Sequence, residues 1–211
     1  MTRINIEIVS DVLCPWCWVG KKNLDKAIQA SGRPNEHFSI TWKPFLLRPS
    51  MPEGGKVKAP DTPENPRVSE RLYEAGQKVD INFTGKCDVA PNTVLAHTLL
   101  RYAAKEQQQK KNNVQHKLAE ILFRMYFTDG QNVGNIQVLE DAAEEAGLEV
   151  KKAIEFINNK DEQALVFNEA VDNTRSGISG VPSFFMNGKL MLEGAQPVDH
   201  FLYAFHDSMS C

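Results

Sequence analysis

The distribution of apolar and polar residues predicts where the strands and helices lie. Isoleucines alternate with polar residues over residues 3–9, and this period of two predicts a half-buried strand. A helix is predicted over residues 14–30, because apolar residues recur there at helical spacing before a Ser-Gly-Arg-Pro sequence that ends it. Alternation returns over residues 38–43, which predicts a second strand.

The middle of the chain contains two segments of different composition, a predicted loop and a predicted block of helices. Residues 48–66 are dense in proline and glycine, which excludes a helix or a central strand and predicts a long loop. Residues 67–175 then show helical spacing almost throughout and predict a block of helices. Within this block, Asn135 is suited to begin a helix and Gly147 to end it.

The C-terminal part of the chain returns to strands. Two apolar runs flank Asn187-Gly188, a pair that favours the tight turn of a β-hairpin. Pro197 opens a last predicted helix. The order of strand, helix, strand, helical block, hairpin and helix predicts an α/β fold.

Composition narrows the class of protein. The chain has 211 residues, of which 42% are hydrophobic and 24% charged, and its net charge is −3. This length predicts one large domain or a domain with an insertion. A mildly acidic chain without a basic run offers no electrostatic footprint for nucleic acid or an anionic membrane. No signal peptide or membrane span is recognisable, so, with Met1 as initiator, we expect a cytoplasmic protein in a reducing compartment.

Cys14-Pro15-Trp16-Cys17 is the feature that indicates a chemistry, because it follows a predicted strand and opens a predicted helix. The positive end of the helix dipole favours a thiolate at Cys14. Pro15 fits the first helical turn, where its missing N–H costs nothing. Cys17 lies three residues on, on the same helix face. This spacing suits Cys14 as the attacking thiol and Cys17 as the resolving thiol of disulfide exchange.

The other two cysteines do not add to this pair. A structural zinc site needs four ligands, and Cys87 and Cys211 form no second CxxC, so no metal is expected. Cys87 is interpreted as a buried small residue, with a regulatory thiol as the alternative. Cys211 is the last residue and is expected to be exposed. None of the histidines has a sequence pattern that places it beside Cys14.

A second motif, Gly180-Val181-Pro182-Ser183, comes just before the hairpin. A proline that enters a strand is a favoured place for a cis bond, which would present the Val181 backbone to an extended peptide. We therefore expect Pro15 and Trp16, beside the thiols, and Val181 and Pro182 to bind substrate.

Together these motifs resemble the DsbA family of the thioredoxin superfamily, and within it the cytoplasmic FrnE-like branch. The resemblance rests on residues 10–17, 45–49, 90–93 and 180–185. It implies a thioredoxin fold, formed by residues 1–60 and 176–211, with an inserted all-helical domain at 61–175. It also implies dithiol–disulfide exchange with protein or small-molecule thiols, with Cys14 as nucleophile, Cys17 as resolving thiol and Pro182 as the cis-proline. No cofactor is implied, apart from glutathione as a thiol co-substrate.

The sequence departs from the periplasmic members of that family at two positions. Trp16 stands where those proteins have His, so we expect a less stabilised Cys14 thiolate and a more reducing couple. Ile8 stands where they carry a buried acid six residues before the first cysteine. Asp11 is then the nearest candidate for proton transfer with Cys17, although a carboxylate that merely organises a turn explains it equally well.

Two other functions stay open at the level of sequence. Glutathione-dependent 2-hydroxychromene-2-carboxylate isomerases and kappa-class transferases share the implied architecture, but they have Ser where this chain has Cys14. A non-catalytic binding protein whose CxxC only senses redox state is the second alternative.

Overall fold

The structure is a computed structural model that describes residues 3–110 and 113–209, without the side chains of 109 and 110. A four-stranded sheet has the order β2-β1-β5-β6. In it, β1 runs parallel to β2 and antiparallel to β5, and β5 pairs antiparallel with β6. The strands are β1 (Ile4–Ser10), β2 (Phe38–Pro44), β5 (Ser183–Met186) and β6 (Lys189–Glu193). The predicted alternation of β1 is confirmed, since its three isoleucines are fully buried.

Helix α1 (Pro15–Ala30) follows β1 directly and packs against the C-terminal helix α8 (Val198–Asp207). The absence of a side chain at Gly20 lets α1 approach β5 closely. A Cβ there would lie 3.0 Å from Pro182 Cγ and 3.1 Å from Phe184 Cζ. The packing of α1 therefore fixes its first turn beside the start of β5.

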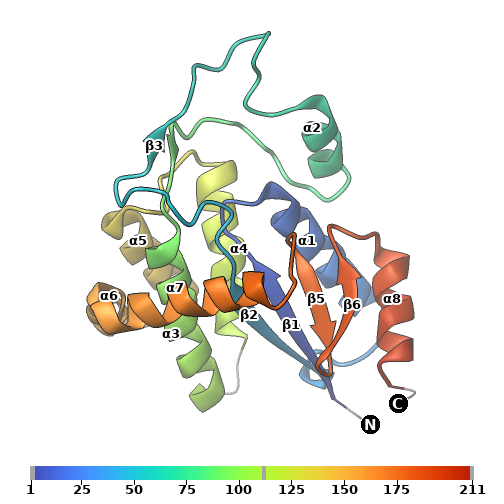
Figure 1. Cartoon of the computed structure of the whole chain (residues 1–211). Coiled ribbons are helices and arrows are strands. Elements are labelled where there is room, and N and C mark those ends of the chain that lie inside the picture. The colour runs from blue at the N-terminus through green and yellow to red at the C-terminus, as the bar shows by residue number, and fades with distance from the viewer. Residues whose placement is uncertain (1–2, 111–112, 210–211) are drawn as a thin grey trace.

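The helical block is inserted between β2 and β5 and lies beside β2 (Figure 1). Its helices are α3 (Val94–Lys110), α4 (Val114–Phe127), α5 (Ile136–Ala146), α6 (Val150–Asn158) and α7 (Lys160–Arg175). Phe123 is fully buried, and its ring centroid lies 6.3 Å from that of Trp18 and 5.9 Å from that of Trp42. Most buried residues of the sheet and of the block thus form one continuous hydrophobic core.

The predicted helix over residues 67–93 is wrong except for α2 (Glu70–Gln77). Asp80 and Gly85 have positive φ angles, which a helix does not allow, and Ile81 and Phe83 reach the core from a segment without helical structure. The segment ends in β4 (Val89–Ala90), which pairs with β3 (Lys56–Val57). Residues 48–93, here called the arch, rise above the first turn of α1 (Figure 1).

Local signals at the other turns are confirmed. Asn187 and Gly188 both have positive φ, as the tight turn between β5 and β6 requires. Asn135 caps α5 through a hydrogen bond from the Gln137 N–H, and Gly147 ends that helix in the left-handed conformation. Within residues 3–110 and 113–209, none of the helices has the length and apolar character that crossing a membrane requires.

Candidate active site

Cys14 is the N-cap residue of α1, and Pro15 is its first helical residue. The Cys17 N–H donates to the Cys14 carbonyl at 3.1 Å, and the first turn carries no acidic side chain. Both cysteines are buried free thiols, Cys14 with 5% and Cys17 with 0% of its surface exposed. The backbone N–H groups of Cys17 and Trp16 in this turn help to lower the pKa of Cys14, and the first turn has no carboxylate that would oppose them.

The two thiols are in electrostatically different environments. A hydrogen bond from the Cys17 thiol holds the pKa of Cys14 below its ordinary value, against the opposing effects of burial and of the Asp11 charge. Burial, together with the neighbouring Cys14, raises the pKa of Cys17 well above its ordinary value. Cys14 is therefore the thiol that ionises first, and Cys17 holds its proton and donates it in a hydrogen bond.

The segment before β5 forms the opposite wall of this site. The Val181–Pro182 peptide bond is cis, and the Cys14 thiol donates to the Val181 carbonyl at 3.6 Å. Trp16 is half-buried, with the Arg71 guanidinium 5.2 Å from the centroid of its ring. The fold thus brings all four residues expected to bind substrate around Cys14, including two from a segment more than 160 positions away in sequence.

Asp11 is 1% exposed, and its backbone carbonyl accepts from the Cys14 N–H at 2.9 Å. Its carboxylate accepts from the Leu13 N–H at 3.1 Å and from the Leu47 N–H at 2.9 Å. These bonds tie the loop before Cys14 to the segment after β2, so the carboxylate organises the loop. Its negative charge also raises the pKa of Cys14.

Sequence reasoning missed His97, which we expected to be unrelated to the site. Its Nε2 lies 3.4 Å from Asp11 Oδ1, and its side chain is buried on the first turns of α3. No local pattern indicates this contact, since a polar residue inside a helical stripe gives no sign of its distant partner. Ser10 was missed as well; its buried side chain lowers the pKa of Cys17 slightly, against the larger effect of burial, which raises it.

Cys87 is buried, and its thiol donates to the Val89 carbonyl at 3.2 Å. This placement fits the interpretation of a small buried residue. Cys211 lies outside the described residues. Over the described part of the chain, no three His, Cys, Asp or Glu residues gather closely enough to hold a metal ion.

Comparison with known proteins relates this geometry to a family. The sequence matches the family model described as DSBA-like thioredoxin domain over residues 5–206. It is 30% identical over 208 residues to the uncharacterized protein YwbO of Bacillus subtilis, and the match covers 97% of this chain and 96% of that protein.

Solved structures show the same fold at lower identity. A probable DsbA oxidoreductase from Streptomyces coelicolor superposes with a TM-score of 0.82 at 22% identity, covering 99% of this chain and 91% of that one. The cytosolic disulfide reductase DsbM of Pseudomonas aeruginosa gives 0.67 at 16% identity, covering 98% and 100%. DsbM has also been solved with GSH. The chain therefore belongs to the DSBA-like thioredoxin domain family, and its fold is the α/β thioredoxin fold of the DsbA-like oxidoreductases with an inserted helical block.

Proposed function

We propose that this protein is a thiol–disulfide oxidoreductase that exchanges disulfides with protein or small-molecule thiols through Cys14 and Cys17. One observation carries the proposal, namely the placement of two free thiols one helical turn apart in opposite environments. Cys14 caps α1 and favours the thiolate, whereas Cys17 is fully buried and keeps its proton. A pair with one nucleophile and one protected partner is what two-step exchange requires.

In the reducing direction, the Cys14 thiolate attacks one sulfur of a substrate disulfide. The substrate S–S bond breaks, a mixed disulfide forms, and the first substrate sulfur leaves as a thiolate that takes up a proton. Cys17 then loses its proton and attacks the Cys14 sulfur, which releases the second substrate sulfur and leaves a Cys14–Cys17 disulfide. The substrate gains two electrons, and the protein is oxidised by the same two. The oxidising direction is the reverse of these steps.

The high pKa of Cys17 has a consequence for this sequence of steps. A buried thiol that holds its proton does not compete for the first attack. It becomes a nucleophile only when a base takes its proton in the mixed disulfide. Asp11 is the proposed candidate, because it is the buried carboxylate of this loop and lies beside His97. Its hydrogen bonds to two backbone N–H groups equally support a role in loop structure alone.

We further propose that Pro15, Trp16, Val181 and Pro182 contact the substrate. The first three are half-buried and so retain surface beside Cys14, whereas Pro182 is buried directly before β5. The Val181 carbonyl already accepts from the Cys14 thiol, so substrate backbone bound at Val181 would lie next to the reacting sulfur. Contacts of this kind recognise extended peptide rather than one particular side chain.

We also propose a cytoplasmic, FrnE-like enzyme with glutathione as a thiol co-substrate. The likeness to DsbM, a cytosolic reductase that has been solved with GSH, supports this proposal. A couple more reducing than that of the periplasmic oxidants is expected, because Trp16 offers no charge to the thiolate. Redox equilibration with glutathione buffers measures the potential and fixes the physiological direction.

Insulin reduction by dithiothreitol tests the exchange activity itself. The wild type is expected to accelerate it, Cys14→Ser to abolish the acceleration, and Cys87→Ser to leave it unchanged as the matched control. Cys17→Ser is expected to accumulate the mixed disulfide with substrate. An inactive wild type that binds glutathione tightly would instead support the glutathione-dependent isomerase or transferase. An inactive wild type without glutathione binding would support a redox-sensing binding protein.

A further inference from the structure

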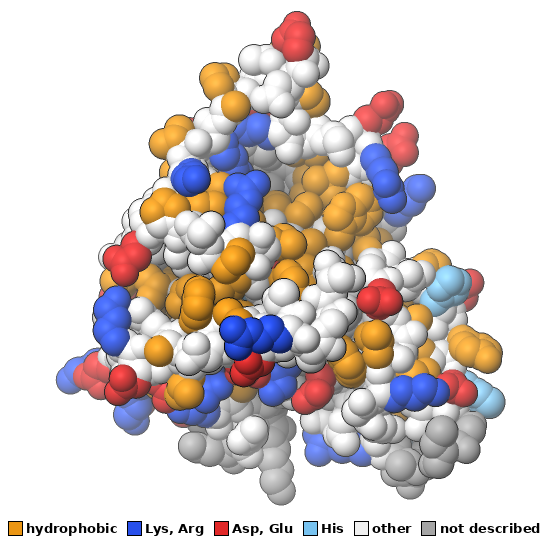
Figure 2. All heavy atoms as spheres, in the orientation of Figure 1, with side chains coloured by type: hydrophobic (Ala, Val, Ile, Leu, Met, Phe, Trp, Pro, Cys, Tyr) orange, Lys and Arg blue, Asp and Glu red, His pale blue; other side chains and the backbone are white. Residues whose placement is uncertain are grey.

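A pocket of about 230 Å³ lies under the arch, beside the loop that carries Cys14. Leu13 and Pro15, which flank Cys14 in sequence, form part of its wall, but neither Cys14 nor Cys17 lines it. Figure 2 shows the hollow under the arch, with apolar side chains on its floor and basic side chains around it. The pocket is therefore a separate space that adjoins the proposed exchange site.

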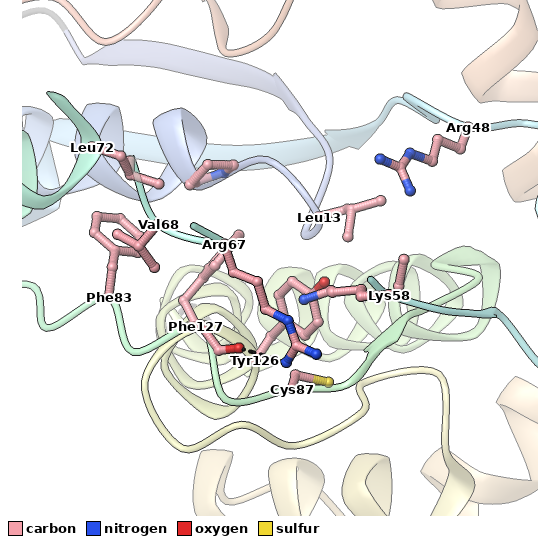
Figure 3. A pocket seen from close by; sticks show the side chains of 13 residues that line it. Leu13, Arg48, Lys58, Arg67, Val68, Leu72, Phe83, Cys87, Tyr126 and Phe127 are labelled. Atoms are coloured by element: carbon pink, nitrogen blue, oxygen red, sulfur yellow. Dashed lines mark hydrogen bonds between the residues drawn. The ribbon is translucent and has the colours of Figure 1, made fainter. Parts of the chain in front are cut away.

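The lining of the pocket divides into an apolar and a basic part. Figure 3 shows Val68, Leu72, Phe83 and Phe127 gathered at one end, whereas Arg48 and Lys58 lie at the other. Arg67 reaches in between these two ends, above Cys87. No carboxylate is among the lining residues. A cavity built in this way is complementary to a molecule with an apolar body and an anionic end.

The basic side chains are only partly neutralised by the protein. Arg67 pairs with Asp88 at 2.7 Å and donates to the Gly85 carbonyl at 3.1 Å. Within the described part of the chain, neither Lys58 nor Arg48 forms an ion pair, and the Lys58 ammonium lies 4.7 Å from the centroid of the Tyr126 ring. Burial is the main cause that lowers the pKa of Lys58, and the charges of Arg67 and Arg48 lower it further, against opposing effects of Cys87 and Asp88. An anion bound among these cations would relieve their mutual repulsion.

We propose that this pocket binds a small organic anion with a flat apolar body, such as an aromatic carboxylate, whose anionic group faces Lys58 and Arg48 and whose body packs against Phe83 and Phe127. The volume suits a molecule of one or two rings rather than a peptide chain. The aromatic walls favour a planar body. Arg48 is exposed and marks the entrance, whereas Lys58 is half-buried and makes the stronger contact.

This inference goes beyond the proposed exchange function and does not depend on it. A molecule held here touches Leu13 and Pro15, and so lies against both sides of the residue that carries the nucleophilic sulfur. A thiol or disulfide of this chemical class would then be held close to Cys14. Binding itself requires neither thiol, so it is expected in a Cys14→Ser variant that has lost exchange activity.

Calorimetric titration of the full-length reduced protein with 2-naphthoate and with 2-naphthamide tests the proposal. The two probes share the same rings and differ in charge. We expect 2-naphthoate to bind and the neutral amide to bind about tenfold more weakly or worse, since a charge-assisted hydrogen bond contributes at least that much. Lys58→Met is expected to weaken 2-naphthoate about tenfold and to leave the amide unchanged.

Two variants control for altered folding. Lys56→Met removes an exposed lysine two residues before Lys58 that does not line the pocket, and it should bind 2-naphthoate as the wild type does. Lys58→Arg keeps the charge and should retain binding. Equal affinity for acid and amide, an unaffected Lys58→Met, or no binding of 2-naphthoate at millimolar concentration would each overturn the proposal. Cys14→Ser, which cannot perform exchange, should still bind 2-naphthoate with unchanged affinity. The binding test can therefore succeed or fail independently of the exchange function.

Discussion

Cys17 is expected to stabilise the Cys14 thiolate before it resolves the mixed disulfide. Its thiol hydrogen-bonds the Cys14 sulfur, and this bond is the largest effect that lowers the pKa of Cys14. Comparing Cys17→Ser with Cys17→Ala isolates this effect. Both variants lose the resolving thiol, but serine retains a donor of similar size and alanine retains none. Because Cys17 is fully buried, water does not readily take the place of the lost donor.

The magnitude follows from the value of a hydrogen bond to a charged acceptor. Such a bond contributes about 1.5–3 kcal/mol, and one pKa unit corresponds to about 1.4 kcal/mol. The pKa of Cys14 should therefore be about 1–2 units higher in Cys17→Ala than in Cys17→Ser. At a pH below both pKa values, the thiolate fraction falls by about 10–100-fold, while the more basic thiolate is intrinsically more nucleophilic and offsets about half of this on a logarithmic scale. The net expectation is an attack about 3–10-fold slower.

The assay uses a background in which Cys87 and Cys211 are replaced by Ser, so that Cys14 is the only thiol of each variant. Ultraviolet absorbance of the thiolate gives the titration curve, and the rate of alkylation by iodoacetamide across pH gives an independent one. Circular dichroism of both variants controls for folding. If the two variants titrate at the same pH, the hydrogen bond is not what lowers the pKa, and the helix terminus alone must account for it.

Three further predictions address the surroundings of this pair. Asp11→Asn should lower the pKa of Cys14, because the charge that raises it is removed, and an unchanged pH profile of the exchange rate would eliminate Asp11 from the mechanism. Gly20→Ala should cost about 1–3 kcal/mol in urea unfolding despite the better helix propensity of alanine, because its Cβ would meet Pro182 at 3.0 Å. A Gly20→Ala protein that is more stable than the wild type would mean that Pro182 and Phe184 move aside at little cost. Phe123→Ala should cost about 3–5 kcal/mol in one unfolding transition, and two separate transitions would contradict the single core.

Much of the thioredoxin-like part could be predicted from local sequence. The strand at 3–9, the helix after Cys14 and the Asn187-Gly188 hairpin are each set by residues close together in the chain. The predicted helix over residues 67–93 is wrong because distant contacts, rather than neighbouring residues, determine the structure of this segment. There, long-range burial of Ile81 and Phe83, and backbone turns at positive φ, outweigh helical spacing that is only weakly expressed.

By itself, the sequence determined the order of elements and the chemistry of the CxxC motif, because helical and strand periods, turn residues and the helix dipole act within a few residues. Only the tertiary structure decided which distant groups surround that motif. His97 reaches Asp11 from the helical block, and Lys58 and Arg67 of the arch line one pocket together with Phe127 of α4. Such meetings depend on how the helical block and the arch pack on the sheet, and packing is a property of the whole core rather than of any local pattern.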